Sequence, residues 1–573
     1  MRTISKERLL IFFLLLSFFL YHLSIIDYGL PFFFNADETA FVTSTIGYVS
    51  FITGINLTFL DPIYAPLINL ILTFYSVFIN EFLINSLSIS QIKSKIYLNP
   101  ELFIFYGRVA SLIVSTCSIY LLYLIFKKLK INIIIYGILL VTFATSLVSL
   151  SISSVDGKNS YYLLFFLIQI YFFIKYLIKI EKFKFKSYII FAILASIAWG
   201  INYWPAFVSI YAIMILHLRK FNFSKIYYPI TFFIIFIIFG PIINMIYSNE
   251  MIIGHIININ QINNFDLSLF FIRFIDDFII CLKILFFSEK NFLILLIFTP
   301  IFLINKHFVF KKNFLIILLL LLEPIILFSI SEKVYPELRY FAGNICIILI
   351  LVSIIFNEFY KQKTKYITIF LLISNFIFII NNIKIHHEIS NIISEKYSFY
   401  NFNEDIKKYK PKVLYLVDLK FRKNITNNML YYNLHQNNLI KNSDFQKDSL
   451  NEIIKKISYL ETKSNDLIDD RTLKESIRYF NYNFFEIIDN KLFFDFLKKD
   501  FDYVVINKNV NNNINNYVKN NFVFERDYIN NKNKIFFKKH REILRFYSLG
   551  ENYKNSNLDK IYGENYSLYK LDL

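Results

Sequence analysis

The chain alternates long apolar segments with short loops rich in lysine and arginine, and this alternation restricts the possible folds more than any other feature. A helix needs about 20 apolar residues to cross the hydrocarbon core of a bilayer. About eleven segments of this chain approach or reach that length, and 56% of its 573 residues are hydrophobic. We therefore expect a mainly α protein, built as a polytopic bundle of about eleven membrane spans.

The distribution of charge assigns a side to each loop. Lysine and arginine concentrate in cytoplasmic loops of membrane proteins. The N-terminus carries Arg2, Lys6 and Arg8 and no small-residue cleavage site after its apolar run, so we interpret it as a retained, cytoplasmic signal anchor. The expected spans are residues 9–26, 106–126, 131–151, 161–180, two in the hairpin 188–216, 226–246, 292–304, 314–330, 341–355 and 367–380.

Two connections are expected to lie along the outer membrane surface. The outer loop 27–105 contains the apolar, semi-amphipathic stretches 41–52 and 65–87, which the charge pattern favours as surface helices rather than spans. A later loop contains Arg273 and Asp276-Asp277, and it should also include a surface helix. The transmembrane domain is predicted to cover residues 1–383.

Composition changes after about residue 384, where charged residues and asparagine become frequent. Residues 412–417 and 502–506 have the pattern of buried strands, and 522–525 and 534–537 are weaker strand candidates. Helical patterns lie between them, for example at 450–460. We predict a C-terminal, extracytoplasmic α/β domain over residues 384–573.

Composition also excludes several function classes. The net charge of +18 comes largely from the basic loops, so it does not indicate nucleic acid as a partner. None of the three cysteines lies in the polar C-terminal part, so neither a disulfide framework nor a cysteine-based zinc site is supported. There is no glycine-rich nucleotide loop and no GxSxG motif. No residue pattern requires a metal, and the sequence leaves a divalent cation open.

Acidic residues open two of the outer loops. Asp37 and Glu38 stand in the sequence Asn35-Ala36-Asp37-Glu38 just after the first expected span, and Asp156 opens the second outer loop. Such carboxylates are candidate catalytic groups. Each is also placed to cap a following helix, where the helix dipole stabilises an acidic first turn.

Basic residues stand on the same predicted side. Arg339 lies in the sequence Tyr335-Pro336-Glu337-Leu338-Arg339-Tyr340 before a late span, against the positive-inside pattern. Arg108 at the start of a span and Lys158 beside Asp156 are further candidates for binding an anion. The alternatives are a headgroup contact or ion pair with Glu337 for Arg339, a structural ion pair for Arg108, and an interfacial lysine for Lys158.

In their order along the chain, these motifs resemble those of the integral-membrane glycosyltransferases with the C-type (GT-C) fold. The resemblance is to the branch with protein O-mannosyltransferases and bacterial aminoarabinose transferases. It covers residues 8–380. Members of this branch often have a histidine just before the proline-containing segment that corresponds to Tyr64-Ala65-Pro66-Leu67, and this chain has Ile63-Tyr64 there instead. The matching segments are Asn35-Ala36-Asp37-Glu38, Tyr64-Ala65-Pro66-Leu67, Tyr106-Gly107-Arg108-Val109, Asp156 and Leu338-Arg339-Tyr340.

The resemblance implies transfer of a sugar from a polyprenyl-phosphate donor to a hydroxyl of a lipid, glycan or protein, with inversion. Asp37 would be the general base, with Glu38 and Asp156 shaping the acidic site. The donor phosphate would be bound by a set of four residues: Arg339, Arg108, Lys158 and Tyr335. The implied location is the inner or plasma membrane of a bacterium.

Other functions remain open at this point. A polymerase or ligase of surface polysaccharides also has many spans and a large outer loop. A membrane transporter should show internal repeats and charges near the bilayer midplane, and Glu323 is the clear candidate for such a charge. A non-catalytic membrane scaffold is the third alternative.

Overall fold

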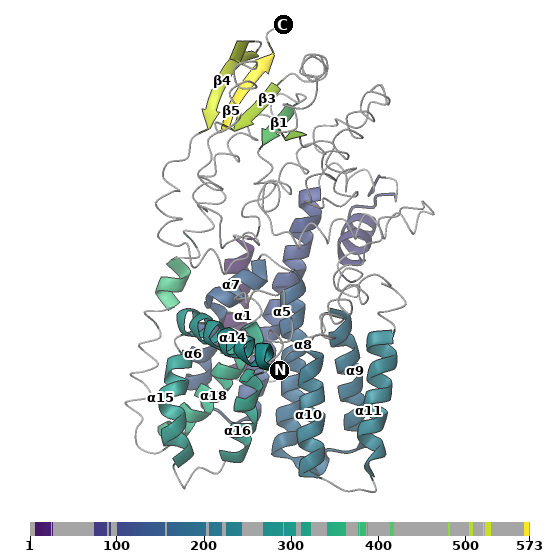
Figure 1. The fold of residues 1–573 in the computed structure, drawn as a ribbon, viewed down its shortest axis with the longest axis vertical. Coiled ribbons are helices and arrows are strands. Elements are labelled where there is room, and N and C mark those ends of the chain that lie inside the picture. The colour runs from purple at the N-terminus through teal and green to yellow at the C-terminus, as the bar shows by residue number, and fades with distance from the viewer. Residues whose placement is uncertain are drawn as a thin grey trace. The chain divides into compact units, whose positions relative to one another are not determined.

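The computed structural model describes the chain in separate stretches. They are residues 6–24, 26, 71, 74–88, 91–92, 100–154, 157–201, 205–220, 225–242, 267–289, 291–304, 311–322, 341–361, 376, 379–384, 387, 413–417, 480–481, 503–507, 519–520, 522–528 and 566–571. The chain divides into two compact units. One contains the helices, apart from the first residues of α5, and the other contains the strands (Figure 1). The boundary between the predicted domains, at residue 384, stays a prediction.

The first unit is helical, as the apolar segments predict. Its elements are α1 (Lys6–Leu23), η1 (Phe74–Ile84), α5 (Pro100–Lys128), α6 (Ile133–Ala144), α7 (Leu147–Ser154), α8 (Gly157–Ile178), η2 (Ile180–Lys182), α9 (Phe185–Ile201), α10 (Ala206–Arg219), α11 (Tyr227–Ile237), η4 (Ile238–Ile242), α14 (Leu267–Ser288), α15 (Asn291–Ile304), α16 (Lys311–Leu319), η6 (Leu320–Leu322) and α18 (Ala342–Lys361).

Three of the described helical stretches are long and apolar enough to cross a membrane: Phe105–Lys128, Asn159–Ile178 and Ala342–Tyr360. Several shorter apolar helices accompany them. These findings identify a mainly helical membrane protein, whereas the count of about eleven spans stays a prediction. The last expected span, 367–380, lies largely outside the described residues.

The structure divides one expected span into two helices. Residues 131–151 form α6 and the start of α7, with a break at Thr145 and Ser146. The Ser146 hydroxyl accepts a hydrogen bond from the backbone N–H of Ser149 at 3.2 Å, which caps the new helix. The capping hydroxyl explains why the continuous apolar pattern does not give one continuous helix.

Helix α14 forms in the loop that was expected to contain a surface helix, and it carries Asp276. Figure 1 shows it running obliquely across the direction of its neighbours, and it packs against α15. The helix itself was therefore predicted correctly, and its position at a membrane surface stays a prediction.

Helix α18 is the centre of the helical unit. Every residue from Phe341 to Asn357 is buried, and the helix packs against α6, α8, α15 and α16. Gly343 allows α18 to approach α8 closely, because a Cβ atom there would lie 2.9 Å from the ring of Phe166 on α8. A larger residue at this position would force α8 and α18 apart.

Hydrogen bonds between helix ends bring the basic loops together. Lys220, after α10, donates to the backbone oxygen of Phe183 at 2.8 Å, and Arg219 donates to the side chain of Asn313 at 2.9 Å. In the loop before α6, the backbone N–H of Asn132 donates to the side chain of Asn357 at 3.0 Å, near the end of α18.

The contacts of Arg219 and Lys220 and the contact between Asn132 and Asn357 lie at the same end of the bundle. The Asn344 side chain, near the start of α18, donates to the backbone oxygen of Leu321 at 3.0 Å, so α16 and α18 run antiparallel. Asn313 and Asn357 consequently lie toward one end. We call it the basic end, because it gathers lysines and arginines of the predicted cytoplasmic loops: Lys127, Lys128, Lys130, Lys182, Lys184, Lys186, Arg219, Lys220, Lys311 and Lys312.

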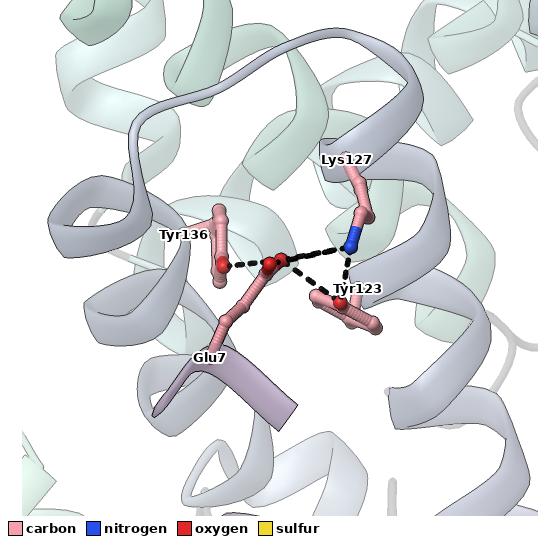
Figure 2. A network of polar contacts seen from close by, with 4 residues as sticks. All are labelled: Glu7, Tyr123, Lys127 and Tyr136. Carbon is pink, nitrogen blue, oxygen red and sulfur yellow. Dashed lines mark hydrogen bonds and ion pairs between the residues drawn. The ribbon is translucent and has the colours of Figure 1, made fainter. Parts of the chain in front are cut away.

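A carboxylate holds three helices together at the basic end (Figure 2). Glu7 Oε1 of α1 accepts hydrogen bonds from the hydroxyls of Tyr123 at 2.9 Å and Tyr136 at 3.0 Å. Lys127 completes the network with an ion pair at 3.1 Å. Desolvation raises the pKa of the Glu7 carboxyl, but the hydrogen bonds from Tyr123, Lys127 and Tyr136 outweigh it, so the pKa lies below its ordinary value. Glu7 precedes the expected span 9–26.

The second unit contains a mixed five-stranded sheet in the order β2-β1-β3-β5-β4. Strands β1 and β3 are parallel, whereas β5 runs antiparallel to β3 and to β4. The predicted strands at 412–417, 502–506 and 522–525 are β1, β3 and β4 in the structure, and the candidate at 534–537 lies outside the described residues. The strand bounds are β1 Val413–Val417, β2 Phe480–Asn481, β3 Tyr503–Asn507, β4 Phe522–Tyr528 and β5 Tyr566–Leu571.

The close approach at Gly343 gives the first prediction. Gly343→Ala should destabilise the protein by about 1–3 kcal/mol, because the added methyl group overpacks a filled core against Phe166. Gly137→Ala is the matched control, since its Cβ would meet nothing within 4 Å. Thermal unfolding of the detergent-solubilised chain measures both. An equal effect of the two substitutions would contradict the packing argument.

The Glu7 network gives a pH dependence. A lowered pKa in the folded state means that the carboxylate stabilises the protein above the pKa of an unfolded glutamate, about 4.3, and that this stabilisation is lost as the pH falls through the folded-state value. Glu7→Gln should therefore lower the unfolding midpoint at pH 7 and lose its effect in acid. Glu181→Gln, at an exposed position, is the control. A pH-independent effect of Glu7→Gln would contradict the assignment.

Candidate functional site

One of the seven predicted site residues, Arg108, has its side chain in the described part of the chain. Lys158 is the second residue of α8, and its side chain lies outside the described residues. The other five also lie outside them: Asp37, Glu38, Asp156, Tyr335 and Arg339. Whether these residues converge on one site stays a prediction.

Arg108 lies at the end of the bundle away from the basic loops. Helix α5 is continuous from Pro100 to Lys128, so Arg108 and Lys127 are separated by roughly 28 Å at 1.5 Å per residue. We call the end that contains Arg108 the distal end. Helix α18 runs between the same two ends, with Asn344 toward the distal end and Asn357 at the basic end.

The Arg108 side chain is buried and connects two helices. Its exposed fraction is 2%, and Nη1 donates to the backbone oxygen of Ile26 at 2.9 Å. Because Ile26 follows α1, this bond joins the end of the first helix to the start of α5. The expected alternative for Arg108 was a structural ion pair. The contact found has the same structural effect, with a backbone carbonyl as the acceptor.

Glu81 is a buried carboxyl group at the distal end that the sequence reasoning missed. It lies on the π-helix η1 with an exposed fraction of 0%. Its Oε1 accepts a hydrogen bond from the Tyr106 hydroxyl at 2.9 Å, and Oε2 accepts one from the Asn85 amide at 3.1 Å. One sequence signal could have identified it, because Glu81 is the only Asp, Glu, Lys, Arg or His residue in the apolar stretch 65–87.

The Tyr106 hydroxyl connects α5 to η1 through its hydrogen bond to Glu81. The first turn of α8 is polar and buried at Asn159 and Ser160. The described part of the distal end therefore combines a carboxyl group, a guanidinium group, a phenol and amides within an otherwise apolar bundle.

Four further polar atoms in the interior have no hydrogen-bond partner among the described residues. They are Oδ1 of Asn344 on α18, Oγ of Ser115 on α5, and Oδ1 of Asn291 and Oγ1 of Thr299 on α15. Other buried hydroxyls bond to carbonyls of their own helix, as Ser111 does to Gly107 at 2.8 Å. The hydroxyls that bond within their own helices serve the helices rather than a ligand.

No group of three His, Cys, Asp or Glu side chains that could hold a metal ion occurs among the described residues. The possible metal-binding pair Asp276-Asp277 lies on α14, where Asp276 is exposed to solvent or lipid. The question of a divalent cation stays open.

No protein-family model matches the chain, and no curated protein matches it either. The resemblance to membrane glycosyltransferases stays a prediction from the short sequence motifs.

The buried contact of Arg108 predicts a loss of stability on substitution. Arg108→Leu should cost about 1–3 kcal/mol or more, because the buried carbonyl of Ile26 loses its hydrogen-bond donor. Arg219→Leu is the control, since Arg219 is exposed although it also bonds to a neighbouring segment through Asn313. Thermal unfolding in detergent distinguishes them. A midpoint for Arg108→Leu no lower than that of the control would contradict a structural role for the buried guanidinium.

Proposed function

We propose that the chain is an integral-membrane glycosyltransferase that moves a sugar from a polyprenyl phosphate to a hydroxyl acceptor at the outer face of the membrane. The acceptor class is a lipid, glycan or protein. The proposal combines the mainly helical membrane fold with the ordered acidic and basic motifs of the sequence. In this proposal the bundle has about eleven spans, and residues 384–573 form an extracytoplasmic α/β domain.

The observation that carries the proposal is the separation of basic loops from Arg108. Lysines and arginines of several loops gather at the basic end, whereas Arg108 is buried at the distal end together with Glu81 and Tyr106. If the basic end faces the cytoplasm, as the positive-inside rule favours, the distal end faces outward. This is the side where a lipid-linked donor can be used without nucleotide sugars, in the inner or plasma membrane of a bacterium.

The proposed reaction is a direct displacement at the anomeric carbon. The acceptor hydroxyl attacks this carbon and transfers its proton to the carboxylate of Asp37. The bond between the anomeric carbon and the phosphate oxygen breaks, and its electron pair stays with the phosphate. Glu38 orients Asp37 or the acceptor, and Asp156 shapes the acidic site. A single displacement inverts the configuration of the sugar.

The leaving phosphate gains negative charge and needs cationic partners. Arg339 is the leading candidate, because a guanidinium presents paired N–H donors to phosphate oxygens. Lys158 and Arg108 add positive charge, and Tyr335 adds a hydroxyl donor. Arg108 already donates to the Ile26 carbonyl, so its contribution would combine a structural and an electrostatic effect.

A transfer assay with sugar-labelled polyprenyl phosphates tests the proposal. Membranes containing the chain are incubated with a panel of such donors, and the label that reaches other lipids, glycans or proteins is measured. Asp37→Asn should lower the transfer rate about 100-fold or more, the usual contribution of a general base. Asp276→Asn, at an exposed carboxylate of α14, should leave the rate unchanged.

Two results would contradict the proposal. Full transfer by Asp37→Asn would exclude Asp37 as the base. Absence of transfer from every donor in the panel, in membranes that contain the folded wild-type chain, would exclude the glycosyltransferase function.

A further inference from the structure

Helix η1 presents two different faces, and this fixes the direction of Glu81. On one face, Glu81 and Ser76 are fully buried. On the other, Phe74, Phe78 and Phe82 are exposed and form a ladder of stacked rings with centroids 4.9 and 5.6 Å apart. The apolar ladder faces away from the bundle, so the helix directs its one carboxyl group inward.

The π-helical hydrogen bonding of η1 holds the partner of Glu81 in place. The backbone N–H of Asn85 donates to the backbone oxygen of Asn80 at 3.0 Å, which continues the i→i+5 pattern one residue past the helix. The Asn85 side chain then donates to Glu81 Oε2. π-Helical segments are rare in proteins, and those that occur are often found at functional sites.

The start of α5 is held from two sides. Tyr106 and Arg108 are two residues apart, which places them about 200° apart around a helix of 3.6 residues per turn. Tyr106 bonds to Glu81 of η1, and Arg108 bonds to the carbonyl of Ile26 after α1. The position of Arg108 is therefore fixed by α1 on one side of α5 and by η1 on the other.

We infer that Glu81 is a positioning residue for the transfer reaction, which acts through Tyr106 to fix the start of α5 and the guanidinium of Arg108 in the donor-phosphate site. The inference rests on the proposed function. Glu81 affects the reaction through Tyr106 and Arg108, and no contact between Glu81 and the substrate is proposed.

The contacts favour a carboxyl group at this position. Glu81 accepts a hydrogen bond at each of its two oxygens, from Tyr106 and from Asn85. Glutamine has the same shape and one oxygen, so its amide group cannot accept the second bond. An apolar side chain would leave the tyrosine hydroxyl without this acceptor in a buried setting, which is costly.

The experiment is a double-mutant cycle in the full-length chain. The variants are Glu81→Gln, Tyr106→Phe and their combination, and the readouts are kcat and KM for a polyprenyl-phosphate sugar together with the unfolding midpoint. Tyr106→Phe removes one hydroxyl, so it remains informative if the Glu81 variant folds poorly. Glu289→Gln is the matched control, because Glu289 is also a buried carboxyl group with an asparagine donor, Asn291, at 2.6 Å.

We expect Glu81→Gln and Tyr106→Phe each to lower kcat/KM for the donor about tenfold, the size of one hydrogen bond to a charged group. The kcat/KM of the double variant should be no lower than that of the less active single variant, because the effects of residues that act through one another do not add. Glu289→Gln should keep the wild-type kcat/KM.

Three outcomes would overturn the inference. Lower unfolding midpoints with unchanged kcat/KM would assign Glu81 to stability alone. Multiplying effects in the double variant would show that Glu81 does not act through Tyr106. Absence of transfer by the wild-type chain would overturn the proposed function and the positioning role together. This third result differs from the first two, in which the wild-type enzyme is active.

Discussion

The fold depends on one constraint, which is that backbone N–H and C=O groups inside a bilayer must bond to one another. Helices satisfy this requirement within each segment, and the apolar segments of the chain form helices throughout the described part of the first unit. Once helices are imposed, their ends become the places where polar chemistry is possible. The distal end and the basic end are both consequences of this requirement.

The two ends of the bundle use charge differently. At the basic end, side chains bond across helix termini and hold several loops together, with much of their charge left at the surface. At the distal end, Glu81 and Arg108 are almost completely buried and bond to groups on other elements. Buried polar groups are costly unless they are hydrogen-bonded, and the contacts with Tyr106 and Ile26 offset that cost. Under the proposed function, the same contacts would hold Arg108 in the donor-phosphate site.

The helices were predictable from the sequence because most apolar segments are bounded by charged residues. Runs of buried apolar residues also predicted the hairpin of α9 and α10 and the strands β1, β3 and β4. The break at Ser146 was not predictable, because a single capping hydroxyl decides it within a continuously apolar segment. Glu81 was missed because its partner Tyr106 is 25 residues away. The spacing gives no sign of that contact, and the remaining site predictions concern residues outside the described part of the chain.

The Glu7 network has a consequence for how the chain is made. Glu7 is synthesised first, and its partners follow 116, 120 and 129 residues later. The network can therefore close only after α5 and the first turn of α6 have been synthesised. Once closed, it holds Lys127 of α5 at the same end of the bundle as Glu7 of α1. All four residues of the network belong to the part of the chain that is made before most of the bundle.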